Sequence, residues 1–114
     1  MPRHYYALDL RDDAAAIAEY ERMHQPGNVW PEIVASIRAS GIEAMEIFRT
    51  GNRLVMVVQV PDGYDASATR GADDPKMHDA WEALMDRYQQ RLPWAWAGQK
   101  WVPMTRIFSL AQHA

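Results

Sequence analysis

The spacing of hydrophobic residues changes several times along the chain, and each change predicts a new secondary-structure element. Short runs of apolar and β-forming residues predict four strands, at 5–10, 44–49, 53–60 and 105–110. Apolar residues at helical spacing predict three helices, from Asp12-Asp13 to about Met23, from Pro31 to just before Gly41, and from Pro75 to about Gln90. Residues 61–76 and 92–100 are expected to form loops because they are rich in turn-forming residues.

The third predicted strand indicates how the sheet is built. Residues 54–60 are apolar on both faces, so this strand should be central and covered on both sides. Thr50-Gly51-Asn52 predicts a hairpin with the strand before it. The element order favours an α+β fold in a ferredoxin-like order, with a mainly antiparallel sheet and helices on one face. The 114 residues fit a single domain, 1–114, whose second sheet face a second subunit would naturally cover.

The third predicted helix carries an apolar stripe. Its members lie at i, i+4, i+7, i+8 and i+11, and they are Met77, Trp81, Leu84, Met85 and Tyr88. Trp81 is therefore expected in the core, with the wall of a ligand pocket as the alternative. Glu82 and Gln89 are expected to be solvated, and Asp73-Asp74-Pro75 to start the helix.

Composition and charge exclude several classes of function. The absence of cysteine excludes disulfides, a thiolate nucleophile and a cysteine zinc site. The net charge of −3 argues against a nucleic-acid partner and against an anionic membrane surface. No apolar run approaches the roughly 20 residues that span a bilayer, and no signal peptide is visible, so a cytoplasmic protein is expected. The four histidines lack helical ligand spacing, so no metal site is expected.

The strongest chemical signal lies at the end of the first predicted helix. Tyr20 and His24 are four residues apart and share one helix face, and Ile17 indicates that this face is also the apolar one. The pair should therefore point inward. The ordinary pKa of histidine, about 6.5, suits acid/base chemistry at neutral pH. The alternative is a partly buried histidine that bonds a backbone carbonyl or merely caps the helix.

The five tryptophans are a second signal. Trp94, Trp96 and Trp101 fall in a predicted loop, where flat rings suit a sugar-pocket wall or a subunit interface equally well. Trp30 stands at the start of the second helix. Glu46 lies inside a predicted strand, where a carboxylate needs a partner or a ligand hydroxyl unless it faces solvent.

One signature spans the first two helices: Glu19-Tyr20-Glu21-Arg22-Met23-His24, followed by Trp30-Pro31-Glu32-Ile33. It resembles the signature of the L-rhamnose mutarotase family, with Met23 where many relatives carry arginine. The resemblance covers nearly the whole chain and includes Lys100-Trp101 and Ile107-Phe108. The strand Ala44-Met45-Glu46-Ile47-Phe48 looks more like a subgroup associated with L-fucose.

The resemblance implies a dimeric α+β barrel and a sugar mutarotase without a cofactor. Such an enzyme would interconvert the α and β anomers of a 6-deoxy-L-hexose, L-fucose or L-rhamnose, by acid/base ring opening. The expected partners are a monosaccharide and a second copy of the chain. The expected site residues are His24 as acid/base, Tyr20 as its hydrogen-bond partner, and Glu46, Trp81, Trp101 and Trp30 as sugar-binding residues.

Two other classes of function remain open from the sequence. A non-catalytic monosaccharide-binding module would use the same aromatic residues but leave anomer exchange at the rate of the buffer. A small α+β-barrel oxygenase or haem-binding protein would share the fold, and a coloured or oxygen-consuming preparation would favour it.

Overall fold

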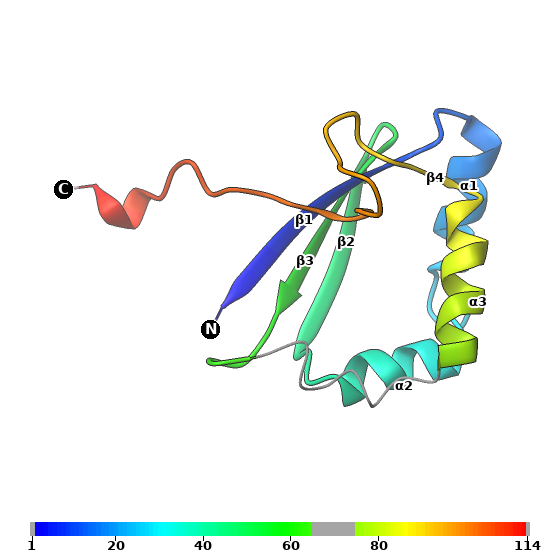
Figure 1. The fold of residues 1–114 in the computed structure, drawn as a ribbon, viewed down its shortest axis with the longest axis horizontal. Coiled ribbons are helices and arrows are strands. Elements are labelled where there is room, and N and C mark those ends of the chain that lie inside the picture. Colours follow the sequence, from blue (N-terminus) through cyan, green and yellow to red (C-terminus); the bar gives the residue numbers. More distant parts are fainter. Residues whose placement is uncertain (1, 65–74, 114) are drawn as a thin grey trace.

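A curled antiparallel sheet forms the centre of the molecule, and the computed structural model describes residues 2–64 and 75–113 (Figure 1). The strands run in the order β2-β3-β1-β4, and β5 also pairs with β1. Their bounds are β1 Arg3–Leu10, β2 Ala44–Thr50, β3 Arg53–Gln59, β4 Gln89–Gln90 and β5 Val102–Pro103. The helices are α1 Ala14–Met23, α2 Pro31–Ala39 and α3 Pro75–Asp86, with the short 3-10 helix η2 at Leu110–Gln112. The α+β fold with an antiparallel sheet is therefore confirmed.

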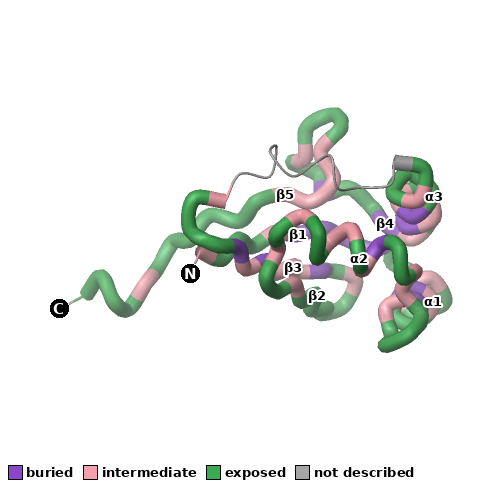
Figure 2. Tube along the Cα trace, turned by 90° about the horizontal axis from the view of Figure 1, so that it is seen from below, coloured by how far each residue is buried: buried purple, intermediate pink, exposed green. Residues whose placement is uncertain are grey.

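The strand register gives the sheet two different faces. Leu8 pairs with Leu54 and His4 with Val58, so alternation places Leu8, Leu10, Leu54 and Val58 on one face, where all four are buried. The three helices lie on one side of the strands, and the buried positions gather where the strands meet them (Figures 1 and 2). We call this the helix-covered face. The opposite face, where Tyr5 pairs with Val57 and Phe48 with Val55, is called the open face.

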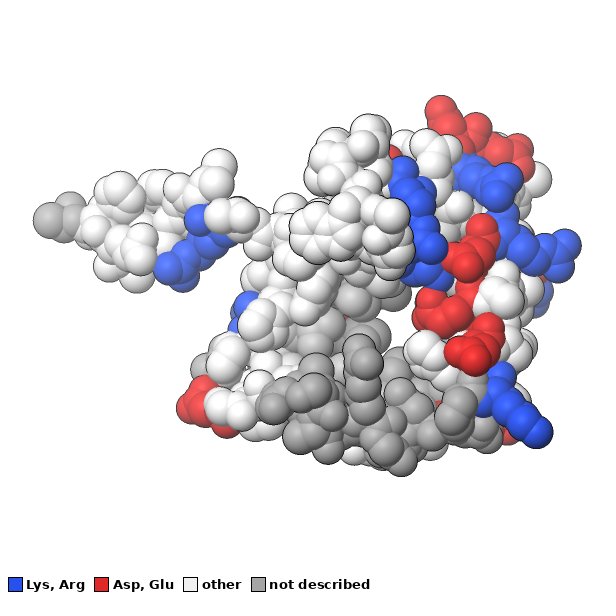
Figure 3. Space-filling model, viewed as in Figure 1, with Lys and Arg blue, Asp and Glu red and all other residues white. Residues whose placement is uncertain are grey.

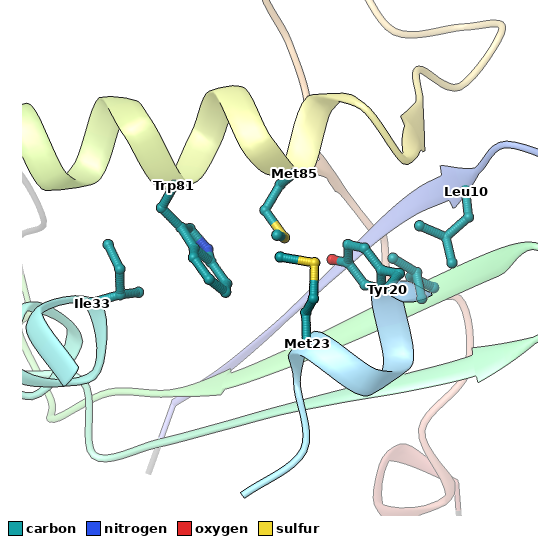
Figure 4. Packing of buried hydrophobic residues seen from close by; sticks show 7 residues of the cluster. Leu10, Tyr20, Met23, Ile33, Trp81 and Met85 are labelled. Carbon is teal, nitrogen blue, oxygen red and sulfur yellow. The ribbon is translucent and has the colours of Figure 1, made fainter. Parts of the chain in front are cut away.

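The core forms where the helix-covered face meets all three helices. Its buried members are Leu10, Tyr20, Met23, Ile33, Leu54, Trp81 and Met85 (Figure 4). Trp81 and Met85 come from the predicted stripe of α3, which confirms Trp81 as a core residue. Burial of such large side chains is the main source of stability in a domain of this size.

Both ends of α1 are fixed by specific hydrogen bonds. At the start, the Asp13 carboxylate accepts a hydrogen bond from the Ala16 backbone N–H at 3.2 Å and so caps the helix. At the end, the His24 N–H donates to the Glu21 carbonyl, and the Asn28 amide donates to the Arg22 carbonyl at 2.7 Å. The orientation of the last turn of α1 is therefore set, and this turn carries Tyr20 and His24.

Two predictions about the second half of the chain are wrong. The strand expected at 105–110 does not form: after β5 the backbone leaves the sheet, and Ile107 is 94% exposed (Figure 1). The third helix ends at Asp86 instead of about Gln90, and Gln89 joins β4. In the first case the segment runs past the end of β1: after the Met104 N–H donates to the Tyr5 carbonyl at 2.8 Å, only Arg3 and His4 of β1 remain, and the free edge of β2 lies two strands away.

The structure describes only part of the loop expected at 61–76. Residues 61–64 form no helix or strand, whereas 65–74, and with them the expected Asp73-Asp74 helix start, lie outside the described residues. In the described ranges no helix is long and apolar enough to cross a membrane.

The N-cap of α1 yields a stability prediction. Asp13→Ala removes the acceptor for the Ala16 N–H and should lower the free energy of unfolding by about 1 kcal/mol. Urea unfolding monitored by tryptophan fluorescence measures this change. The matched control is Asp12→Ala, an exposed neighbour. Equal losses in the two variants would contradict the capping role of Asp13.

Candidate active site

Four of the residues proposed from the sequence lie together on the helix-covered face. The ring of His24 tilts against that of Tyr20, with centroids 4.3 Å apart, and meets Trp81 edge-on at 5.8 Å. Trp30 contacts Trp81 in the same edge-on manner at 5.2 Å. The elements that bring them together are α1, the residue before α2, and α3. The structure therefore forms an aromatic cluster around one titratable imidazole.

The local sequence explains why these side chains converge. Tyr20 and His24 share one face of α1 because they are four residues apart. Trp30 precedes Pro31, which occupies the first position of α2. Trp81 projects from the apolar stripe of α3 onto the same place.

A backbone hydrogen bond determines the state of the His24 ring. Its Nδ1 lies 2.7 Å from the carbonyl oxygen of Tyr20. A carbonyl oxygen only accepts, so Nδ1 carries the proton and donates it. In the neutral ring this leaves the lone pair on Nε2, which is the state that a general base requires.

The Tyr20 hydroxyl is a neutral hydrogen-bond donor at physiological pH. Its side chain is 3% exposed, and this burial raises the pKa of Tyr20 to about 12. A hydrogen bond from Gln89 acts in the opposite direction, whereas the negative charge of Glu82 raises the pKa further. At neutral pH Tyr20 therefore keeps its proton and is not a phenolate.

Gln89 is a site residue that the sequence analysis missed. It was expected to be solvated on the third helix, but it is only 9% exposed and its Nε2 donates to the Tyr20 hydroxyl at 3.3 Å. The helical spacing misled the prediction because α3 ends three residues earlier. The only signal for its burial is its pairing with Leu10, which the sequence does not display.

Ionic contacts connect the loop after β4 to α3. The Lys100 ammonium lies 2.5 Å from Glu82 and 2.8 Å from Asp86. Figure 3 shows acidic side chains along α3, at the border of a hollow between this helix and the strands. The contacts hold Trp101, the next residue, where it packs against the core. Glu82 was expected to be solvated, and it is half-buried with Lys100 as its partner.

Glu46 is not brought to this cluster. It pairs with Val57 and therefore projects on the open face, where it lines a small recess of about 110 Å³ with Arg3 and Gln59. Trp94 and Trp96 also lie apart and are 61% and 73% exposed.

Two further features of the surface bear on the assignment. A recess of about 900 Å³ lies between the start of β1 and residues 103–106, and no member of the aromatic cluster lines it. It lies where the C-terminal segment leaves the sheet, and its lining includes His4, Tyr5 and Tyr6, which form no ring contact like that of the Tyr20–His24 pair among the described residues. Among the described residues, no group of three or more His, Asp or Glu side chains could hold a metal ion.

The fold and the cluster define a small ferredoxin-like α+β protein with a Tyr–His pair set among tryptophans. The model of the family described as L-rhamnose mutarotase matches residues 3–110. The chain belongs to this family.

Individual relatives are consistent with this assignment. The chain is 54% identical to an L-fucose mutarotase of Xanthomonas campestris pv. campestris, over 98% of this chain and 90% of the relative. It is 32% identical to an L-rhamnose mutarotase of Acidiphilium cryptum, over 70% of this chain and 75% of the relative. The crystal structure of an L-rhamnose mutarotase from Formosa agariphila shares the fold, with a TM-score of 0.64 at 19% identity over 96% of this chain and 99% of that one.

Burial of Tyr20 predicts a late phenol titration. The folded pKa of about 12 lies above the ordinary value of 10, so stability should fall as the pH rises from 10 through 12. Below pH 10 both the folded and the unfolded chain carry the proton, and the effect vanishes. Absorbance at 295 nm, compared between wild type and Tyr20→Phe, should give a difference curve with its midpoint near 12. A midpoint near 10 would show that the phenol is not desolvated.

Proposed function

We propose that the Tyr20–His24 cluster interconverts the α and β anomers of a 6-deoxy-L-hexose, with L-fucose as the first substrate to test. The observation that carries the proposal is the His24 ring, whose Nδ1 is held by the Tyr20 carbonyl so that Nε2 is free to move a proton. The family and the 54% identical L-fucose mutarotase support it.

The reaction needs only proton transfer. A base removes the proton from the anomeric O1–H, the C1–O5 bond breaks as O5 is protonated, and an open-chain aldehyde forms. Rotation about C1–C2 followed by the reverse steps gives the other anomer. Atoms and electrons balance within the sugar and the acid/base groups, so the reaction as written requires no metal and no redox cofactor.

Each cluster residue has a role in this proposal. His24 exchanges the proton through Nε2, the backbone carbonyl of Tyr20 accepts the hydrogen bond that holds the His24 ring, and the Tyr20 hydroxyl donates to a sugar oxygen. Trp81, Trp101 and Trp30 offer flat faces and edges on which the apolar C–H faces of a pyranose pack. Glu46 is not part of this arrangement within one protomer because it projects on the open face.

We also infer that the protein is a homodimer joined through its open face. Tyr5 and Phe48 on this face are 43% and 54% exposed, and the half-buried Val55 and Val57 lie between them. The C-terminal segment adds Ile107, Phe108 and Leu110, each at least 63% exposed. Apolar side chains gathered on a sheet face in this way are typical of surfaces that associate, and a second copy of the chain offers a self-complementary partner.

Removal of the imidazole tests the catalytic role of His24. His24→Ala should slow anomer exchange of L-fucose at least about a hundredfold, because general acid/base catalysis contributes about that much or more. Saturation-transfer NMR between the two anomeric protons measures the rate. His4→Ala, an exposed histidine on β1, is the matched control and should exchange at the wild-type rate.

The same measurement separates the possible outcomes. Wild-type exchange by His24→Ala would exclude this residue as the acid/base. Binding of L-fucose by the wild type without accelerated exchange would instead indicate the non-catalytic binding module. Comparison with L-rhamnose, D-galactose and D-ribose then ranks the substrates.

A charge on the open face tests the dimer. Phe48→Asp should shift the protein from dimer to monomer, because the buried interface would have to desolvate a carboxylate. Size-exclusion chromatography with light scattering measures the mass. Ala18→Asp, which adds the same charge at an exposed position of α1, should leave the mass at that of the wild type. A monomeric wild type would contradict the proposal.

A further inference from the structure

Gln89 forms a buried polar pair with Tyr20 that the fold leaves incomplete. The Gln89 Nε2 donates to the Tyr20 hydroxyl oxygen at 3.3 Å, and both side chains are at least nine-tenths buried. The Gln89 Oε1 is buried and has no hydrogen-bond partner among the described residues. In residues 2–64 and 75–113, the bond from Gln89 is likewise the only one formed by the Tyr20 hydroxyl, so its proton has no acceptor there.

This arrangement is costly for a purely structural residue. A buried polar atom without a partner destabilises the fold, whereas an apolar side chain of similar length would fill the same space without that loss. The other buried polar residue of the described chain, Asp9, is fully engaged with Arg53 at 2.8 Å. Of the two buried polar residues of the described chain, Gln89 is therefore the one with an unpaired side-chain atom, and it bonds the hydroxyl of Tyr20.

Backbone pairing holds Gln89 in this position. It lies opposite Leu10 in the β1–β4 ladder, and the neighbouring Arg11 N–H donates to the Tyr88 carbonyl at 2.8 Å. The amide therefore approaches Tyr20 from a strand, whereas the Tyr20 ring is held by α1 and packs with its hydroxyl toward Met23 and Met85 (Figure 4). A contact between two fixed elements suits a positioning role.

We propose that Gln89 is a positioning residue that keeps the Tyr20 hydroxyl a donor toward the sugar. Because the Tyr20 oxygen accepts from the amide, its own proton points away from Gln89 and remains available to a sugar oxygen. Rotation of the amide by half a turn would reverse this polarity, since Oε1 would then accept the Tyr20 proton. The inference rests on the proposed mutarotase function and adds to it a residue that sets the direction of one hydrogen bond.

Two substitutions distinguish donor from acceptor. Gln89→Glu offers only an acceptor when ionised and should draw the Tyr20 proton away from the sugar. Gln89→Met has similar length and no hydrogen bond. Both should lower kcat for L-fucose exchange by about tenfold, the effect of one lost hydrogen bond, with KM changed less than about twofold. Gln90→Glu adds the same charge at the exposed neighbour and should behave as the wild type. Wild-type kcat in Gln89→Glu would overturn the donor role.

A double-mutant cycle tests whether Gln89 acts through Tyr20. In the Tyr20→Phe background, Gln89→Met should have no further effect on kcat, because no hydroxyl is left to orient. Independent losses that add would show that Gln89 only supports the core, and the proposal would be wrong. The melting temperature of every variant distinguishes a loss of stability from a loss of kcat. Gln89→Met should melt at no lower temperature than the wild type. An inactive wild type would refute the mutarotase function itself, whereas an active wild type with active Gln89 variants refutes only this inference.

Discussion

Burial of the Tyr20 ring is the contact on which both the core and the site depend. The ring packs in the same cluster as Leu10 and Leu54 of the sheet and Trp81 and Met85 of α3. The same burial raises the pKa of its hydroxyl to about 12, and its backbone carbonyl holds the His24 ring. Because core packing sets these positions, the geometry of the Tyr20–His24 pair is set by the core and not by a loop.

The sequence predicts the centre of the site because that centre depends on local spacing. Tyr20 and His24 meet through a helical period, and Trp81 follows from the stripe of α3. At His24 the two interpretations of the sequence prove compatible. The ring does bond a backbone carbonyl, as the structural alternative expected, and in the neutral ring that bond leaves on Nε2 the lone pair that the proposed acid/base role needs.

The features that the sequence fails to predict depend on the register of the strands and on the residues at which helices and strands end. Gln89 looks solvated on a continued helix, yet α3 ends at Asp86 and the next residues pair with β1. Glu46 sits in a correctly predicted strand, but only the pairing with Val57 reveals that its side chain faces away from the helices. The apolar segment at 105–110 has the composition of a strand, but it runs past the end of β1, and the free edge of β2 lies two strands away. Each case requires knowledge of a neighbour far away in sequence.

The two faces of the sheet have different roles: one holds the core and the candidate site, and the other would form the proposed dimer interface. The helix-covered face buries enough apolar surface to hold the Tyr20–Gln89 pair, in which the Gln89 Oε1 has no partner among the described residues and so lowers stability. The open face carries Tyr5 and Phe48, which a single chain leaves exposed. Association through the open face would add buried apolar area without touching the polar pair, because the strands separate the two faces. A dimer would then add stability that offsets the cost of the unpaired polar atom in the core. The Tyr20 proton would remain available to the sugar. The proposed assembly would thus be linked to the proposed chemistry through stability alone.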